Sequence, residues 1–174
     1  GFDPSMPNLH LGNMVGVLKL KQFQDLGCEV IFLVGDFTGM IGDPTDKSAT
    51  RPVLTHEQTR KNCESWKQQA GKVLKFDGQN PAKFMFNSEW LGKISFEDLI
   101  RITANFTAQQ MLERDFFQKR LKENRPIHLN EFLYPVAQAI DCVKMDVDLE
   151  VGGSDQTFNM LMGRTLMAAL KNKE

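Results

Sequence analysis

The chain is poor in cysteine and has no cysteine pattern typical of a metal site or a disulfide framework. Its 174 residues include Cys28, Cys63 and Cys142, an odd number without a CxxC pair, and three histidines that are isolated from them. Because zinc sites need closely spaced Cys and His ligands, we expect no zinc and no other metal ligand in the chain itself. Unpaired thiols are typical of a reducing compartment, so the sequence predicts a cytoplasmic protein.

The chain also lacks an excess of one charge and a long apolar run. Lys and Arg number 21 against 22 Asp and Glu, so the formal net charge of −1 provides no global field that would attract a polyanion. Any contact with nucleic acid is therefore local or lies outside these residues. No apolar run approaches the roughly 18 residues that a membrane span needs, and the first ten residues have no basic and apolar leader.

The remaining composition is that of one globular domain, with 41% hydrophobic and 25% charged residues. A chain of this length buries roughly 70% of its extended surface in a single core. The first residues, Gly1-Phe2-Asp3-Pro4, form a turn of the kind that follows a strand, and the last helical residues have no C-cap glycine. We therefore expect a chain that is truncated at both ends.

Helical and strand patterns alternate along the chain, which predicts an α/β fold with a doubly wound parallel sheet. Helices are expected over Asn13–Leu26, from Thr55 to about Leu74, from Ser95, from Thr107 to Asn124, over Leu129–Met145 and from Asp155 onward. Buried strands are expected over Glu29–Val34 and 83–87, a short strand over Asp148–Val151, and a loop over Gly35–Ser48. Capping boxes are predicted at Thr55 and Ser95.

The first candidate site residues are His10, Gly12 and Asn13, at the start of the first predicted helix. His10 and Asn13 are three residues apart, so both can lie on one side of a helix N-terminus, which suits a phosphate. Gly12 would let a ligand approach the backbone closely. The alternative is a surface histidine and an asparagine that only caps the helix.

The second candidate segment, Gly35–Ser48, is rich in glycine and follows a predicted strand. It is not a Walker A loop, because the glycine that this motif needs before its lysine is absent. We expect Asp43 to be a rigidly held carboxylate that binds an ammonium or hydroxyl group, unless it only caps its own turn. Lys47 and Arg51 are the best candidates for cations that face a phosphate, unless this loop is simply solvated.

The third candidate segment is a stripe of polar residues on a predicted helix. Tyr134, Gln138 and Asp141 recur at i, i+4 and i+7 among apolar neighbours, so they share one face. An unpaired carboxylate in a mostly dry space is costly, and Asp141 therefore needs a ligand or a partner. The stripe is either a binding site or a polar cluster that is satisfied internally.

A tight turn at Gly152 and Gly153 leads into the last predicted helix, which Asp155 and Gln156 open. The two glycines permit a close backbone turn. Asp155 is either a ligand-binding residue or a simple N-cap.

Four segments in this order, GFDPSMPNLHLGN, GDFTGMIGDPT, EFLYPVAQAID and GGSDQTFN, resemble the catalytic domain of bacterial tyrosyl-tRNA synthetases, which are class I aminoacyl-tRNA synthetases. The resemblance runs over the whole chain. It implies a Rossmann-like catalytic domain over residues 1–174, in part, with a helical insertion at roughly 88–128.

The resemblance implies that the first set of residues binds ATP. His10-Leu11-Gly12-Asn13 corresponds to the HIGH-type signature, which binds the ATP phosphates and stabilises the transition state of amino-acid activation. Asn13 replaces the usual second histidine, so it can still donate a hydrogen bond but carries no positive charge. The ATP-binding residues would be Asp3, Gly12, Gly152 and Asp155, and the catalytic residues His10, Asn13 and Gln156.

The second set would bind tyrosine. The resemblance implies that Asp141 binds the phenol, while Tyr134, Gln138 and Asp43 hold the amino group. The tyrosine carboxylate would attack the α-phosphate of ATP, giving tyrosyl-adenylate and pyrophosphate, before transfer to tRNA(Tyr). No side chain need act as a nucleophile, so catalysis would consist of positioning and charge stabilisation. Mg²⁺ would accompany ATP, and a homodimer is expected from the family.

Several family features are absent from these residues, and other functions stay open. The lysine-rich KMSKS-type loop, the strand that precedes Gly1 in the family and the anticodon-binding segment are missing, so we expect a fragment. A tryptophanyl-tRNA synthetase is the closest alternative, because it shares the fold and related motifs. A small nucleotidylyltransferase and a catalytically inactive piece for folding or dimerisation are the others.

Overall fold

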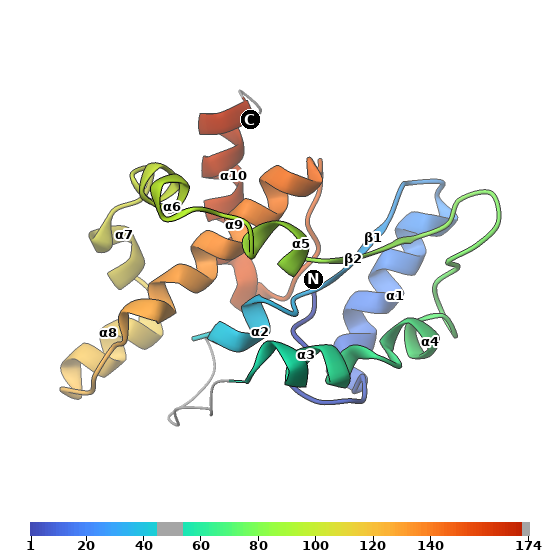
Figure 1. The fold of residues 1–174 in the computed structure, drawn as a ribbon, viewed down its shortest axis with the longest axis horizontal. Helices are drawn as coiled ribbons and strands as arrows, with labels where there is room; N and C mark the ends of the chain where they lie inside the picture. The colour runs from blue at the N-terminus through green and yellow to red at the C-terminus, as the bar shows by residue number, and fades with distance from the viewer. Residues whose placement is uncertain (45–53, 172–174) are drawn as a thin grey trace.

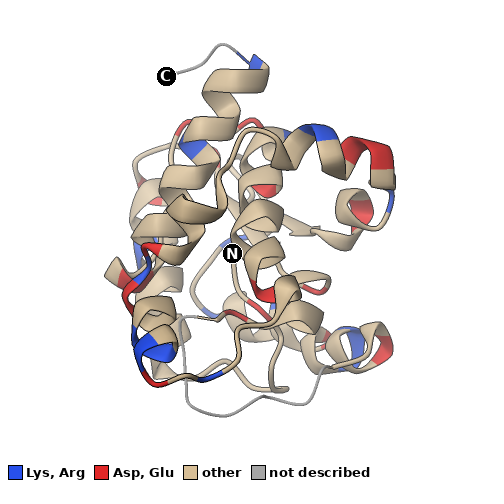
Figure 2. Ribbon diagram, turned by 90° about the vertical axis from the view of Figure 1, so that its left-hand side faces the viewer, with Lys and Arg blue, Asp and Glu red and all other residues tan. Residues whose placement is uncertain are grey.

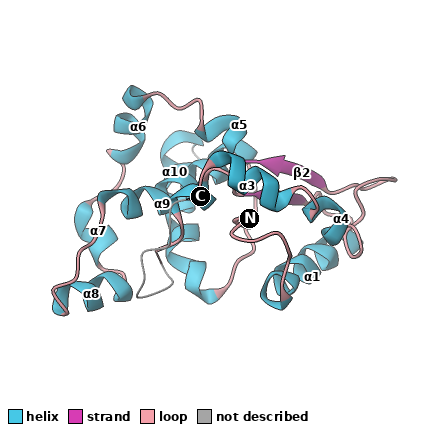
Figure 3. Cartoon of the chain, turned by 60° about the horizontal axis from the view of Figure 1, so that its bottom comes forward, coloured by secondary structure: helices cyan, strands magenta, loops and turns pink. Residues whose placement is uncertain are grey.

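The computed structural model describes residues 1–44 and 54–171 of the chain (Figure 1). Lys47 and Arg51, the two cations expected to face a phosphate, lie outside the described residues. The helices of the second half, from α6 to α10, lie on the opposite side of the molecule from α1 and α4 (Figures 1 and 3).

The sheet consists of two parallel strands, β1 (Ile31–Val34) and β2 (Lys83–Phe86), in register from Ile31↔Lys83 to Val34↔Phe86. Phe2 forms a parallel bridge with Val34 on the other side of β1. β1 is buried as predicted, whereas Lys83 is exposed and the rest of β2 is only half-buried. The expectation of a second fully buried strand is wrong, because among residues 1–44 and 54–171 no strand pairs with the outer side of β2.

The helices account for most of the regular structure (Figure 3). They are α1 (Leu11–Asp25), α2 (Thr38–Ile41), α3 (His56–Cys63), α4 (Trp66–Ala70), α5 (Ser88–Leu91), α6 (Phe96–Thr103), α7 (Ala108–Leu112), α8 (Asp115–Lys122), α9 (Leu133–Met145) and α10 (Thr157–Lys171). Two 3₁₀ turns precede the last two helices, at Leu129–Phe132 and Ser154–Gln156. The predicted capping boxes of Thr55 with Gln58 and of Ser95 with Asp98 are confirmed.

Two predicted helices are each broken into two. The helix expected from Thr107 to Asn124 divides into α7 and α8 because Arg114 has an extended backbone, with φ −61° and ψ 131°. The helix expected from Thr55 to about Leu74 divides at Glu64, whose backbone N–H donates to the carbonyl of Lys61, three residues back. In both cases the local pattern is helical, but the backbone turns between the halves.

Three further expectations about local structure need correction. The loop over Gly35–Ser48 contains the single helical turn α2, closed by a bond from the Gly42 N–H to the Thr38 carbonyl. Residues 148–151 are a bend followed by irregular backbone and pair with no strand in the described part of the chain, so they form no β-strand there. The last α-helix begins at Thr157 rather than Asp155, because the residues before it form a 3₁₀ turn.

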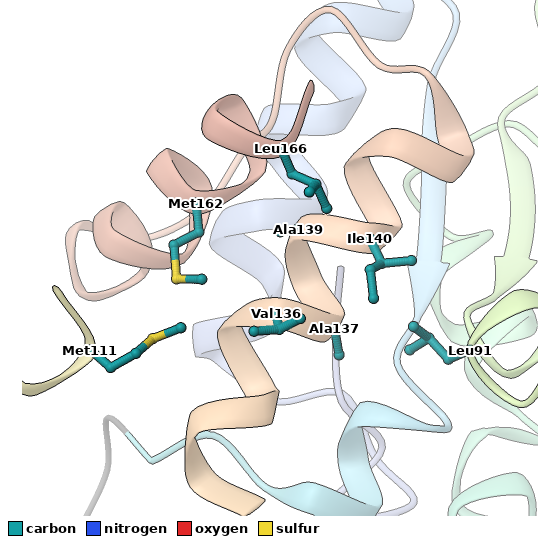
Figure 4. Close-up of a cluster of buried hydrophobic side chains, with 8 residues drawn as sticks. All are labelled: Leu91, Met111, Val136, Ala137, Ala139, Ile140, Met162 and Leu166. Carbon is teal, nitrogen blue, oxygen red and sulfur yellow. The ribbon is translucent and has the colours of Figure 1, made fainter. Parts of the chain in front are cut away.

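The hydrophobic core has two parts. One part joins α1, β1, α3 and α4, around Val17, Phe32 and Trp66. The other joins α9 and α10 with Leu91 and Met111, and Figure 4 shows Met162 and Leu166 of α10 turned toward α9. The two helices can approach closely because position 163 is a glycine, where a Cβ atom would lie 2.4 Å from the Cys142 Sγ.

A buried carboxylate ties the ends of the two strands to α3. Asp36, directly after β1 and its following glycine, is fully buried and accepts hydrogen bonds from the Ser88 backbone N–H (3.0 Å) and hydroxyl (2.7 Å). The Arg60 Nε lies 2.7 Å from the same carboxylate. These contacts fix Asn87, the residue before Ser88, at the carboxyl end of β2.

Charged residues of both signs are interspersed along the helices (Figure 2), in line with the near-zero net charge. No helix in the described ranges has the length and apolar character that crossing a membrane requires.

Candidate active site

Polar side chains converge at the carboxyl ends of the parallel strands. Asp3 follows the bridge at Phe2, Thr38 begins the helical turn after β1, and Asn87 directly follows β2. Helix α9 contributes Tyr134 and Asp141 from across this edge. Ligands of open α/β sheets bind at this edge, so it is the candidate site.

Asp3 is bonded through both carboxylate oxygens. Oδ1 accepts from the Thr38 hydroxyl at 2.7 Å, and Oδ2 accepts from the Tyr134 hydroxyl at 2.8 Å. Burial raises the pKa of Asp3 to about 6, against the opposing effect of these two hydrogen bonds. Burial and the nearby Asp3 carboxylate also raise the pKa of Tyr134 well above its usual value, so this phenol stays protonated. Gly35 is required here, because a Cβ would lie 2.0 Å from Asp3 Oδ1.

Asp141 is 3% exposed and has two partners on the β2 side of the site. Its Oδ1 accepts from the Trp90 indole N–H at 2.7 Å, and its Oδ2 accepts from the Asn87 amide at 3.1 Å. Burial raises the pKa of Asp141 to about 7, although both hydrogen bonds act in the opposite direction. The predicted need of this carboxylate for a partner is therefore met within the protein, by residues that the sequence analysis did not identify.

One hydrogen-bond network joins the two carboxylates. The Asn87 amide nitrogen also donates to the Thr38 hydroxyl at 3.0 Å, and that hydroxyl donates to Asp3. The side-chain oxygen of Asn87, Oδ1, accepts from the Phe37 backbone N–H at 2.9 Å, which fixes the orientation of the side-chain amide. The position of Asn87 as the last residue of the strand predicted over 83–87 was the one available signal for its role.

A second cluster surrounds Gln156. Its amide nitrogen donates to Asp43 Oδ2 at 2.6 Å and to Asp155 Oδ2 at 2.9 Å, and its oxygen accepts from the Asn159 amide at 2.9 Å. Asp43 follows Gly42, whose φ of 78° lies in the left-handed region. The structure thus brings Asp43, Asp155 and Gln156 together from segments that are more than a hundred residues apart in the chain.

His10 and Asn13 bind each other at the start of α1. The His10 backbone N–H donates to Asn13 Oδ1 at 3.0 Å, and the Asn13 backbone N–H donates to His10 Nδ1 at 3.4 Å. His10 is exposed, in agreement with the alternative of a surface histidine, and it is itself the N-cap. Asn13 is its capping-box partner, so only the expectation that Asn13 is the N-cap is wrong. A Cβ at Gly12 would lie 3.0 Å from the His10 ring, so this glycine makes room for the imidazole. Among the described residues, no hydrogen bond joins this pair to the other two clusters.

The other two predicted site residues have a looser connection to these clusters. Gln138 lies on α9 between Tyr134 and Asp141, half-buried, and its side chain forms no hydrogen bond to any residue in the described ranges. Gly152 is exposed, and a Cβ there would lie 3.1 Å from the Gln156 Cβ. In residues 1–44 and 54–171 no three His, Cys, Asp or Glu side chains form a group that could hold a metal ion.

The model of the family "tRNA synthetases class I (W and Y)" matches residues 1–174, so the chain belongs to this family of class I aminoacyl-tRNA synthetases. A tyrosine–tRNA ligase of Haemophilus ducreyi is 50% identical over 173 residues, which are 99% of this chain and 43% of the relative. A tyrosine–tRNA ligase of Nitrosomonas europaea is 54% identical over 166 residues, 95% of this chain and 40% of the relative. The chain therefore spans less than half the length of these relatives, and the predicted resemblance to tyrosyl-tRNA synthetases is confirmed.

Solved structures confirm the α/β, Rossmann-like fold. A C-terminally truncated mitochondrial tyrosyl-tRNA synthetase of Coccidioides posadasii superposes with a TM-score of 0.81 at 26% identity, over 100% of this chain and 52% of that chain. The corresponding enzyme of Aspergillus nidulans gives a TM-score of 0.86 at 26% identity, over 97% of this chain and 52% of that one.

Proposed function

We propose that the protein activates tyrosine with ATP and transfers it to tRNA(Tyr), and that these residues form most of its catalytic domain. Asp141 carries the proposal, because it is a buried carboxylate that Asn87 and Trp90 hold beside the carboxyl end of β2. A carboxylate in this position can accept a hydrogen bond from a phenolic hydroxyl. The names of the relatives with 50% and 54% identity support the same amino acid.

Residues of the two clusters bind different groups of the tyrosine substrate. Asp141 binds the phenol of tyrosine, and Tyr134, Gln138 and Asp43 hold its amino group. The Tyr134 hydroxyl is oriented for this role because it donates a hydrogen bond to Asp3 Oδ2 at 2.8 Å. Gln156, which is held by Asp43 and Asp155, lies at the reacting carboxylate.

The nucleotide lies toward the other end of the site. His10 and Asn13 bind the ATP phosphates at the N-terminus of α1, where free N–H groups and the helix dipole favour negative charge. Asp3, Gly12, Gly152 and Asp155 complete the ATP side, with Asp155 on the ribose. The reaction needs no nucleophilic side chain, so the residues act by positioning the two substrates and by stabilising charge.

We also propose a metal ion, an oligomeric state and a location for the protein. Mg²⁺ would accompany ATP, because it prefers phosphate oxygens and retains several waters. The protein would act as a homodimer in the cytoplasm.

We further propose that residues from roughly 88 to 128 form a helical insertion in the catalytic domain. This region contains helices α5 to α8.

Aminoacylation by the full-length gene product tests this function. We expect tyrosine-dependent charging of tRNA(Tyr), with release of AMP and pyrophosphate, and no charging of tRNA(Trp) with tryptophan. Charging with tryptophan alone would favour the tryptophanyl alternative, which belongs to the same family model. The absence of charging with either amino acid would favour a catalytically inactive role.

A further inference from the structure

Arg114 is a buried arginine in the extended break between α7 and α8. The residue is only 6% exposed. Its guanidinium carbon lies 4.3 Å from the centroid of the Phe116 ring and 4.7 Å from that of the Phe158 ring. The aromatic rings of two helices, α8 and α10, therefore hold the guanidinium in place, and such stacking stabilises a cation.

The two terminal nitrogens of this guanidinium have no acceptor in the part of the chain that the structure describes. Nη1 and Nη2 of Arg114 are both buried, and neither has a hydrogen-bond partner among the described residues. A buried cation without an acceptor is costly, because it loses its water and gains nothing in return. The arrangement is therefore typical of a group whose acceptor arrives with a ligand.

A second arginine in the same aromatic cluster shows the contrast. The Arg120 guanidinium carbon lies 5.2 Å from the Phe117 ring centroid, and its Nη1 donates to Glu131 Oε1 at 3.1 Å while Nη2 pairs with the other carboxylate oxygen. The fold thus provides a bidentate carboxylate partner for Arg120 and none for Arg114 within the described residues.

Arg114 lies beside the Gln156 cluster. Phe158, on which it stacks, is two residues beyond Gln156, and the next residue, Asn159, is fully buried with an unpartnered Oδ1. Burial lowers the pKa of Arg114 to about 10, with the charge of Asp43 acting in the opposite direction. The guanidinium is therefore charged at neutral pH and within electrostatic reach of Asp43, a candidate tyrosine-binding residue.

We propose that the Arg114 guanidinium binds an oxyanion of the substrates beside Asp43 and Gln156. The oxyanion is either the carboxylate of the amino acid or a phosphate of the nucleotide, since both match the planar fork of an arginine. The identity of these substrates rests on the proposed function. By holding the oxyanion, Arg114 would link the α7–α8 segment to the reacting groups.

Binding to the full-length gene product tests the proposal with two pairs of probes. Tyrosine and tyrosinol differ by the carboxylate, and AMP and adenosine differ by the phosphate. Arg114→Met should weaken the binding of tyrosine or of AMP by about 10- to 100-fold, the loss expected for a hydrogen bond to a charged group. Binding of the matching probe without an oxyanion should stay unchanged, and the affected pair identifies the source of the oxyanion.

Two further variants serve as controls. Arg120→Met removes a neighbouring arginine that already has a carboxylate partner, so it should leave all four affinities unchanged. Arg114→Lys retains the charge without the fork and should give a smaller but equally selective loss, which keeps the test decisive where Arg114→Met does not fold.

Equal affinities of wild type and both Arg114 variants for all four probes would overturn the proposal, as would equal losses for all four. A loss that affects only tRNA binding would overturn it too, because the acceptor would then be nucleic acid. These outcomes are distinct from a failure of the proposed function, in which the wild-type protein itself would show no preference for tyrosine over phenylalanine.

Discussion

At the scale of single residues, the proposed selectivity for tyrosine depends on Asp141. Replacing it with alanine removes the buried acceptor that we assign to the phenol, takes away the acceptor of the Trp90 N–H and leaves the Asn87 amide with Thr38 as its remaining side-chain acceptor. A site built to bond a hydroxyl rejects the analogue that lacks it by roughly 10⁴- to 10⁵-fold, a magnitude known from tyrosyl-tRNA synthetases themselves. We expect Asp141→Ala to lose most of this preference.

Equilibrium binding of tyrosine and phenylalanine to wild type and variant measures this effect. Trp90→Phe is a milder change, since it removes one donor to the carboxylate and keeps an aromatic ring, so it should reduce the preference only in part. An unchanged ratio of the two affinities in Asp141→Ala would place the phenol elsewhere.

The raised pKa values of Asp3 and Asp141 predict how stability depends on pH. Their values of about 6 and about 7 lie above the usual 3.8, so the folded state without ligand binds more protons than the unfolded state between pH 4 and 7. Stability should therefore fall as pH rises through this window and level off above it. For Asp141 alone the loss between pH 5 and 8 is on the order of 2 kcal/mol.

Urea unfolding of the ligand-free protein at pH 5 and pH 8 measures this dependence. Asp141→Asn, which does not titrate, should show a smaller difference between the two pH values. A stability that rises between pH 5 and 8 in the wild type would contradict the assignment of raised pKa values.

His10 caps α1, and we propose that it has a second, separable role at the ATP phosphates. His10→Ala should lower the rate of activation by about 10² to 10³, as for other donors used mainly in the transition state, and cost about 1 kcal/mol of stability through the lost cap. His10→Asn restores a good N-cap residue without the imidazole. We therefore expect it to recover the stability but not the rate, as measured by thermal unfolding and single-turnover kinetics. Recovery of both would reduce His10 to a structural residue.

At the scale of elements, the close approach of α9 and α10 depends on Gly163. A Cβ at this position would lie 2.4 Å from Cys142 Sγ but 3.4 Å from Cys142 Cβ. Gly163→Ala should therefore destabilise the fold by about 1 to 3 kcal/mol. In the Cys142→Ala background the clashing sulfur is gone, so the same substitution should cost much less. A double-mutant cycle by urea unfolding measures the difference, and additive effects would rule out the contact.

The predictions from sequence succeeded where local patterns decide the structure. The capping boxes at Thr55 and Ser95 and the helices over 13–26 and 129–145 follow from short-range spacing, which the fold retains. The division at Arg114 could not be predicted in this way, because the helical pattern continues through it and the side chain contacts Phe158 of α10, more than forty residues further along the chain. The half-burial of β2 likewise depends on which strands lie beside it.

At the site, the sequence identified the residues of the known motifs but not those that orient them. Tyr134, Asp141 and Asp43 stand out by spacing and by resemblance. Asn87 and Trp90 follow β2 and lie 54 and 51 residues before Asp141 in the chain. Nothing in the sequence around β2 indicates that they contact the Asp141 carboxylate. Partners at that separation are defined only when the sheet and α9 come together.

At the scale of the whole molecule, the 174 residues contain the proposed tyrosine-binding residues Asp43, Tyr134, Gln138 and Asp141 but no lysine-rich KMSKS-type loop. We expect the chain expressed alone to fold cooperatively, because it has an extensive core, and to be a poor catalyst. Without the cations of that loop to stabilise the leaving pyrophosphate, its activation rate should be lower than that of the full-length gene product by at least on the order of 10³.

Circular dichroism and pyrophosphate exchange on the isolated chain check the two parts of this prediction separately. The spectrum should show mixed helix and strand with a single cooperative melt, while exchange stays near background. Full activity in the isolated chain would show that catalysis does not depend on a KMSKS-type loop.

The most direct measurement of the central claim is amino-acid-dependent exchange of pyrophosphate into ATP by the full-length gene product. It reports formation of the adenylate without requiring tRNA, so it isolates the step that the described site would perform. We expect rapid exchange with tyrosine and exchange near background with phenylalanine and tryptophan. Comparable exchange with tyrosine and phenylalanine would contradict the account, because it would show that no group in the site, Asp141 included, recognises the phenolic hydroxyl.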